Sequence, residues 1–149
     1  MPRSNRRLGL AFVLVAAVFA VDQISKAIVR GAADRLPWRL GGGLRLELNY
    51  NSGISFSRFA GQGAVVTVLV GAVVVAVSAA LFLAPPRYRP ALGIILGGAV
   101  SNLVDRFRFG GTVVDFIGVY RWPTFNLADA FILAGTLLLV VQVLRVPRD

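Results

Sequence analysis

Few residues in this 149-residue chain could carry out chemistry. The sequence contains seven carboxylates and sixteen basic residues, of which Lys26 is the only lysine, and it has no cysteine and no histidine. Without histidine, Ser-His-Asp and Cys-His mechanisms and an HExxH zinc site are excluded. Without cysteine, a thiolate nucleophile, a disulfide and an iron-sulfur cluster are excluded as well. Any catalysis must use carboxylates, lysine, arginine, hydroxyl groups or amides, and we expect no metal and no cofactor.

Two aspartates lie in settings that favour opposite protonation states. Asp115 follows two valines and precedes Phe116-Ile117, and such an apolar setting raises the pKa of a carboxyl group by desolvation. Asp129 comes three residues after Asn126, a typical N-cap, and the start of a helix favours an ionised carboxylate. Such an acid and base could together promote attack of water on an amide. The residues alone leave open that Asp129 is only a capping-box residue and Asp115 only a loop carboxylate.

The elements that must position these residues are long apolar segments. The chain is 56% hydrophobic and 15% charged, with a mean hydropathy of +0.73, whereas a soluble domain has about 45 to 50% apolar and about 25% charged residues. The surplus indicates lipid as a second solvent. A membrane-spanning helix needs about 20 mostly apolar residues. We predict one domain over residues 1–149, an all-α membrane protein with four transmembrane helices at about 8–29, 64–83, 91–106 and 127–146.

The third of these segments contains small residues at a regular spacing. Gly93, Gly97 and Ser101 recur at i+4, the spacing that lets helices approach closely in lipid. We therefore expect this helix to be central in the bundle.

The two longer connections, about 31–63 and 107–126, carry strand patterns. Residues 44–51 alternate between apolar and polar, Ser52-Gly53 offers a turn, and residues 54–57 alternate again, which predicts a small hairpin. The β-branched stretch 112–117 predicts a further extended segment. These pieces predict a small β platform at the outer bilayer surface, an amphipathic flap resting on headgroups, or both.

Polar residues converge at one end of the predicted helices. Charges at membrane depth cost about 2.5 to 3.5 kcal/mol each on insertion scales, so they normally face a partner or a wet cavity. Those outside the aspartate pair could take part in the chemistry or could fasten helix ends together through ion pairs and amides. The converging residues are Asp22, Lys26, Asn102, Asp105, Arg106, Asp115, Asn126 and Asp129.

The basic residues predict the orientation in the membrane. An even number of spans places both termini on one side, where short segments carry seven arginines close to helix ends, so we expect the termini in the cytoplasm. The net charge of +9 is expected to face anionic headgroups rather than nucleic acid. The amino terminus imitates a secretory signal with a cleavage site near Ala17–Ala20, but the apolar pattern continues beyond it. We expect an uncleaved first span.

Five short motifs occur along the chain in a fixed order. They are DQISK at 22–26, NSGISF at 51–56, GGAVSNLVDR at 97–106, VVDFI at 113–117 and FNLAD at 125–129. In this order and on four spans, they resemble the motifs of bacterial lipoprotein signal peptidase, or signal peptidase II, a family of aspartic intramembrane proteases. The resemblance covers nearly the whole chain.

The resemblance implies cleavage of the signal peptide from prolipoproteins, on the amino side of a cysteine that carries diacylglycerol. It implies that Asp115 and Asp129 are the catalytic pair and act without a covalent intermediate. It implies a multi-pass protein of the bacterial inner membrane, expected to be a monomer, with lipidated signal peptides and membrane lipids as partners. In the long loop it implies a β platform that guides the peptide and a mobile helix over the site. The implied substrate-binding or supporting residues are Asn51, Gly53, Asn102, Arg106, Asn126, Asp22, Lys26 and Asp105.

Two positions depart from the family pattern. Ser101 stands where the family usually has glycine, and Ile54-Ser55 replaces the usual small pair after Gly53. Neither touches the carboxylates, so we expect them to change a helix contact or the substrate preference more than the activity. Arg106 is placed to bond a lipid or peptide carbonyl or to brace Asp105.

The same residues could also occur in proteins of other classes. A Ser-Lys protease would use Lys26 as base with one of the serines 52, 55, 57 or 101, but arginine and aspartate neighbours would keep this lysine charged. A small ion- or proton-coupled transporter would place its acids near mid-bilayer and show an internal repeat, whereas here the acids gather at one surface. A membrane scaffold without a functional site would not explain why so many polar residues lie on one side of the membrane.

Overall fold

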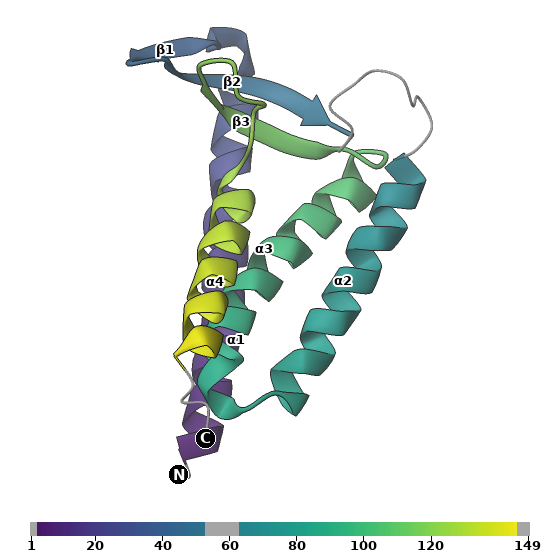
Figure 1. Cartoon of the computed structure of the whole chain (residues 1–149). Coiled ribbons are helices and arrows are strands. Elements are labelled where there is room, and N and C mark those ends of the chain that lie inside the picture. The colour runs from purple at the N-terminus through teal and green to yellow at the C-terminus, as the bar shows by residue number, and fades with distance from the viewer. Residues whose placement is uncertain (1–2, 53–62, 146–149) are drawn as a thin grey trace.

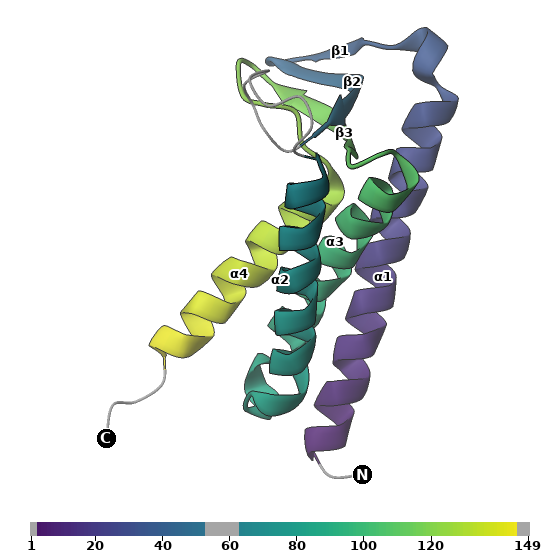
Figure 2. The same ribbon diagram turned by 90° about the vertical axis from the view of Figure 1, so that its right-hand side faces the viewer.

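The computed structural model describes residues 3–52 and 63–145, and every contact given below lies within those ranges. Four helices form a bundle: α1 (Arg3–Gly31), α2 (Gly63–Leu83), α3 (Arg89–Arg108) and α4 (Leu127–Leu144). Three strands, β1 (Trp38–Gly41), β2 (Leu44–Asn51) and β3 (Val113–Val119), form a sheet across one end of the bundle (Figure 1). The start of α1 and the end of α4 lie at the opposite end (Figures 1 and 2). This confirms the predicted helical membrane fold with a small β platform.

Three of the helices are long and apolar enough to cross a membrane: Asn5–Gly31, Gly63–Leu83 and Leu127–Leu144. Their large apolar side chains point outward; Val68 and Val75 of α2 are 71% and 70% exposed. Such a surface is costly in water and favourable in lipid. The fourth helix, α3, ends in the polar residues Asn102, Asp105 and Arg106, which are buried in the protein.

Helix α3 is the central helix, as the sequence predicts. It packs against α1, α2 and α4 and buries one side along most of its length. A Cβ atom at Gly93 would lie 2.7 Å from the carbonyl oxygen of Ala11, and one at Gly97 would lie 2.8 Å from that of Val15. These glycines let α1 approach at backbone distance, which is how small residues stabilise helix pairs in lipid.

The sheet has the order β1-β2-β3, and both pairs of strands are antiparallel. The predicted strand at residues 44–51 is confirmed as β2, and the extended segment at 112–117 is confirmed as β3. The predicted pairing of residues 44–51 with residues 54–57 lies outside the described residues, as do Gly53 and Ile54-Ser55. The long loop also supplies β1, which the sequence analysis did not predict because it is only four residues long.

Candidate active site

Asp115 lies in the middle of β3, opposite Asn49 of β2, with its side chain buried. The side-chain amide of Asn51 donates to its Oδ2 atom at 2.8 Å, and that of Asn126 donates to Oδ1 at 2.7 Å. The pKa of Asp115 is raised to about 6, chiefly by desolvation and in addition by the Asp129 carboxylate, while the two amide donors and Lys26 limit the rise. The direction agrees with the prediction made from its apolar neighbours.

Asp129 lies in the first turn of α4 and forms the predicted capping box with Asn126. Its backbone N–H donates to Asn126 Oδ1 at 2.9 Å, and the Asn126 N–H donates to Asp129 Oδ2 at 3.3 Å. The other carboxylate oxygen, Oδ1, accepts from the amide of Asn102 at 2.8 Å. Asp129 therefore caps its helix and also joins the polar cluster on α3.

Asn126 connects the two aspartates. Its side-chain nitrogen donates to Asp115 and also to Asn102 Oδ1 at 3.2 Å, while its backbone and side-chain oxygen hold Asp129. The side chain is fully buried. Since one asparagine binds both carboxyl groups, Asp115 and Asp129 belong to a single site although they come from a strand and a helix.

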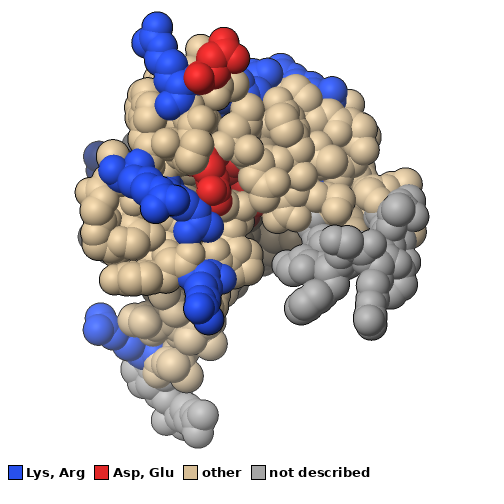
Figure 3. Space-filling model, turned by 90° about the horizontal axis from the view of Figure 1, so that it is seen from above, with Lys and Arg blue, Asp and Glu red and all other residues tan. Residues whose placement is uncertain are grey.

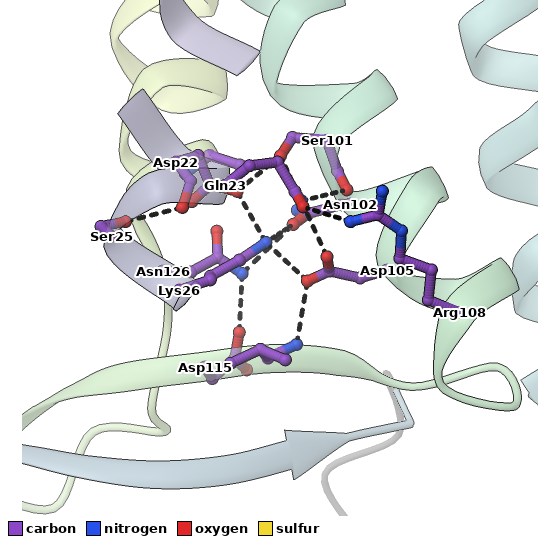
Figure 4. Close-up of polar contacts among 12 residues, drawn as sticks. Asp22, Gln23, Ser25, Lys26, Ser101, Asn102, Asp105, Arg108, Asp115 and Asn126 are labelled. Carbon is purple, nitrogen blue, oxygen red and sulfur yellow. Dashed lines mark hydrogen bonds and ion pairs between the residues drawn. The ribbon is translucent and has the colours of Figure 1, made fainter. Parts of the chain in front are cut away.

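Lys26 forms the centre of the buried network that continues from these residues into the helix bundle (Figure 4). Its ammonium group lies 2.7 Å from Asp22 Oδ2 and 2.8 Å from Asp105 Oδ2, and it donates to Asn102 Oδ1 at 2.9 Å. A lysine thus supplies the positive charge that these buried carboxylates require. Among the described residues, no three acidic side chains are grouped so that they could hold a metal ion.

The two carboxylates bound to Lys26 also hold backbone next to the aspartate pair. Asp22 Oδ1 accepts from the N–H of Ala128 at 2.8 Å, and Asp105 Oδ2 accepts from the N–H of Val114 at 3.1 Å. Ala128 immediately precedes Asp129, and Val114 immediately precedes Asp115. One lysine and two carboxylates therefore connect α1 and α3 to both elements that carry the candidate dyad.

Gln23 and Ser101 join this network, although the sequence analysis did not predict them as site residues. The Gln23 amide donates to Ser101 Oγ at 3.0 Å and to Asp105 Oδ1 at 2.8 Å, and the Ser101 hydroxyl donates to Asp22 Oδ2 at 2.7 Å. The departure at Ser101 adds a hydrogen-bonded link between α1 and α3. Its place one helical turn before Asp105 was the available signal.

Arg106 binds backbone rather than Asp105. Its Nη1 atom donates to the carbonyl of Gly111 at 2.6 Å and to that of Ser52 at 3.3 Å. The expected alternative, a brace on Asp105, does not occur in the described part of the chain. The Nε atom of Arg106 is buried and has no hydrogen-bond partner among those residues.

The sequence matches the family model for signal peptidase (SPase) II over residues 14–145. The chain belongs to the signal peptidase II family. It is 39% identical to the lipoprotein signal peptidase of Rhodococcus jostii over 96% of this chain and 76% of that protein. It is 40% identical to the lipoprotein signal peptidase of Moorella thermoacetica over 91% of this chain and 93% of that protein. A solved bacterial membrane enzyme shares the fold, with a TM-score of 0.82, 21% identity and coverage of 93% of this chain and 95% of that one.

Membership in the signal peptidase II family makes this chain a membrane peptidase of the aspartic class that removes signal peptides from prolipoproteins. Nothing supports the transporter alternative. The Ser-Lys alternative has no structural support either, because Lys26 is occupied by two carboxylates and an amide oxygen, and no hydrogen bond joins it to a serine of the described chain.

Proposed function

We propose that the chain removes signal peptides from diacylglyceryl-modified prolipoproteins and that Asp115 and Asp129 are its catalytic pair. The observation that supports this pair most strongly is how the four carboxylates in the site are bound. Asp22 and Asp105 are ion-paired to Lys26, whereas Asp115 and Asp129 are bound by asparagine amides and backbone. A carboxyl group held by neutral donors can exchange a proton at lower cost than one committed to a buried ion pair.

In this mechanism, Asp129 is the base and Asp115 the acid. Asp129 takes a proton from a water molecule while the water oxygen bonds to the scissile carbonyl carbon, and Asp115 gives its proton to the carbonyl oxygen. The resulting diol collapses with cleavage of the C–N bond. The leaving nitrogen takes the proton from Asp129, and Asp115 recovers one from the diol. Water and the peptide yield an acid and an amine without a covalent intermediate.

The substrate enters from the membrane as a helix that partly unwinds near the sheet. Its scissile amide lies on the amino side of the lipidated cysteine, just outside the hydrocarbon. The lipid chains stay in the bilayer against apolar helix faces and fix the depth of the bond, so specificity depends largely on position. The location of Asp115 in the sheet and of Asp129 in the first turn of α4 supports this placement.

Four residues are proposed to hold the unwound peptide. Asn51, Asn102 and Asn126 donate to the aspartates, and they can bind peptide groups where the substrate displaces some of these hydrogen bonds. The partnerless Nε of Arg106 supports a bond to a peptide or lipid carbonyl. Gly53 is proposed to border the peptide-binding site as well, because it lies in the same sequence motif as Asn51.

The triad of Asp22, Lys26 and Asp105 is proposed to act through position rather than through contact with substrate. Its two carboxylates hold the backbone N–H groups of Ala128 and Val114, each one residue before a catalytic aspartate. The spacing of the dyad then depends on ion pairs that are buried and geometrically fixed.

The whole chain is proposed to act as one protease domain and as a monomer. It would lie in the bacterial cytoplasmic membrane with both termini in the cytoplasm and the sheet at the extracytoplasmic surface. The common end of α1 and α4 opposite the sheet supports this orientation (Figure 2), as does the distribution of arginines near the helix ends.

The decisive experiment compares cleavage of a lipidated prolipoprotein peptide by the wild type, Asp115→Asn and Asp129→Asn. Each variant is expected to lose about 10²- to 10⁴-fold in rate, the typical contribution of a positioned acid or base. Asp34→Asn, an exposed acid in the turn after α1, is the matched control and should retain full activity. An unlipidated peptide should be cleaved poorly by all four proteins. Full cleavage by either dyad variant would exclude the mechanism.

A further inference from the structure

Two arginines lie directly opposite one another on the sheet. Arg39 of β1 and Arg45 of β2 are cross-strand partners, so their side chains project from the same face about 5 Å apart at Cβ. Like charges in this position destabilise a sheet. Arg45 is partly compensated, because it lies 2.9 Å from Glu47 and donates to the Tyr120 carbonyl at 2.6 Å. Arg39 is exposed and has no hydrogen bond or ion pair with any described residue, so its charge is available to an anionic group.

This arginine pair borders a path that leads from the active site. An open groove of about 570 Å³ runs along β2 from Asn51 and Ser52 to Arg45, with residues 121–124 on its other side. A second hollow of about 500 Å³ contains Arg39, Arg45 and Tyr120. Arg45 lines both, and Asn51, at the opposite end, donates to Asp115. The two hollows therefore form one path across the sheet.

The path carries an excess of positive charge. Arg39, Arg45 and Arg121 line it, and Glu47 is its only acidic residue among those that line the two hollows. Seen from above, basic atoms are spread widely and acidic atoms occupy few places (Figure 3). A concave surface with this balance attracts anionic groups and repels cationic ones.

The arginine face is turned away from lipid. Trp38 precedes Arg39, and its cross-strand partner Leu46 follows Arg45, so both project from the reverse face. An apolar reverse face with a tryptophan is typical of a surface resting at the membrane interface. The occupant of the arginine path therefore approaches from the aqueous side.

We propose that this path binds the segment of the prolipoprotein that follows the cleavage site and selects acidic side chains in it. The proposal rests on the proposed function, because a peptide cleaved at Asp115 must continue away from the membrane on its mature side. Gly118, the partner of Arg45, is three residues along β3 from Asp115, so the Arg45 and Asp115 side chains project from opposite faces of the sheet, and the peptide must pass round the end of β2 at Asn51 to reach Arg45. Asn51 and Arg45 are six residues apart on β2, about 20 Å, so for an extended peptide the selected positions are about six to eight residues after the scissile bond.

The test uses full-length protein in zwitterionic nanodiscs and three lipidated prolipoprotein peptides. The peptides differ only at the sixth to eighth positions after the scissile bond, which carry Glu, Gln or Lys. The wild type is expected to cleave the Glu peptide about three- to tenfold more efficiently than the Lys peptide at low salt, with a smaller ratio at high salt. Arg39→Gln should lower the Glu-to-Lys ratio of kcat/KM by about two- to fivefold. Arg35→Gln removes the same charge from an exposed site outside the path and should leave the ratio unchanged.

Equal cleavage of the Glu and Lys peptides by the wild type would overturn the proposal, as would an equal loss of selection in Arg35→Gln. If Arg39→Gln left the Glu-to-Lys ratio unchanged and altered cleavage only in nanodiscs that contain anionic lipid, the occupant would be a headgroup and the proposal would fail. Failure of the wild type to cleave even the Gln peptide would instead contradict the proposed function. In that case, the dissociation constants of the three peptides are measured with Asp129→Asn. Tighter binding of the Glu peptide than of the Lys peptide would support the proposed selection, and equal binding would overturn it.

Discussion

Charged side chains are compensated differently in two regions of the molecule. One is the buried polar cluster of Asp22, Lys26, Asn102 and Asp105, and the other is the pair of Arg39 and Arg45 on the outer face of the sheet. In the cluster, Lys26 is 1% exposed and bound to two carboxylates and an amide oxygen. On the outer face, Arg39 faces Arg45 with a single carboxylate, Glu47, nearby. Buried charges must be paired within the protein because water cannot reach them, whereas exposed charges are hydrated and remain available to a ligand. The first region is therefore suited to holding geometry, and the second to recognising a ligand.

The largest predicted effect that separates the two regions is on stability. Lys26→Met leaves Asp22 and Asp105 buried without a counter-ion, and losing one partner of a buried ion pair costs about 3 to 5 kcal/mol. We expect a large fall in the thermal unfolding midpoint of the purified protein. Arg39→Gln removes one member of an exposed like-charge pair and should leave the midpoint unchanged or raise it slightly. Equal midpoints for the two variants would show that the cluster is not held by its ion pairs.

The cluster should also depend on close helix packing, which can be tested at two glycines. A Cβ atom at Gly98 would lie 2.7 Å from the carbonyl oxygen of Ala128, beside Asp129, whereas one at Gly71 would meet nothing within 4 Å. Gly98→Ala should displace the start of α4 and lower kcat by about 10- to 100-fold, since small misplacements of catalytic groups are costly. Gly71→Ala should leave kcat unchanged. Wild-type kcat in Gly98→Ala would contradict the role of this contact.

The protonation of Asp115 provides a prediction about pH. Burial raises its folded-state pKa to about 6, above the ordinary value of 3.8. Between these values the folded state binds more protons than the unfolded state, so the free energy of unfolding should fall as pH rises from about 4 to about 6. Infrared titration should show a carboxyl band with a midpoint near 6 that is missing in Asp115→Asn. A band at the ordinary value would show that the site is solvated.

The smallest effect is expected at Ser101. Ser101→Ala removes the hydroxyl that donates to Asp22 and accepts from Gln23, while Lys26 still binds Asp22. The loss of one such hydrogen bond costs about 0.5 to 1.5 kcal/mol. Chemical denaturation should detect this loss, and cleavage of a lipidated peptide at saturating concentration should continue. An inactive but folded variant would mean that Ser101 acts in the reaction itself.

Local sequence was sufficient for the features that depend on near neighbours. The capping box of Asn126 and Asp129, the Asp22–Lys26 pair, and the raised pKa of Asp115 follow from spacings of a few residues and from adjacent apolar side chains. The order of the motifs was sufficient for the family and the fold. Helix periodicity and desolvation act over such short distances that the chain's own order encodes them.

Contacts between distant segments were decided by the tertiary structure. The hydrogen bond from Lys26 to Asn102 joins residues 76 apart, and that from Ala128 to Asp22 joins residues 106 apart. The place of Ser101 between α1 and α3, the turn of Arg106 toward Gly111 and Ser52, and the strand β1 also emerge only there. The sequence by itself determined which groups could do the chemistry and that lipid surrounds them. Packing decided which carboxylates are neutralised by a lysine and which stay bound by amides, because that choice depends on which helix ends meet.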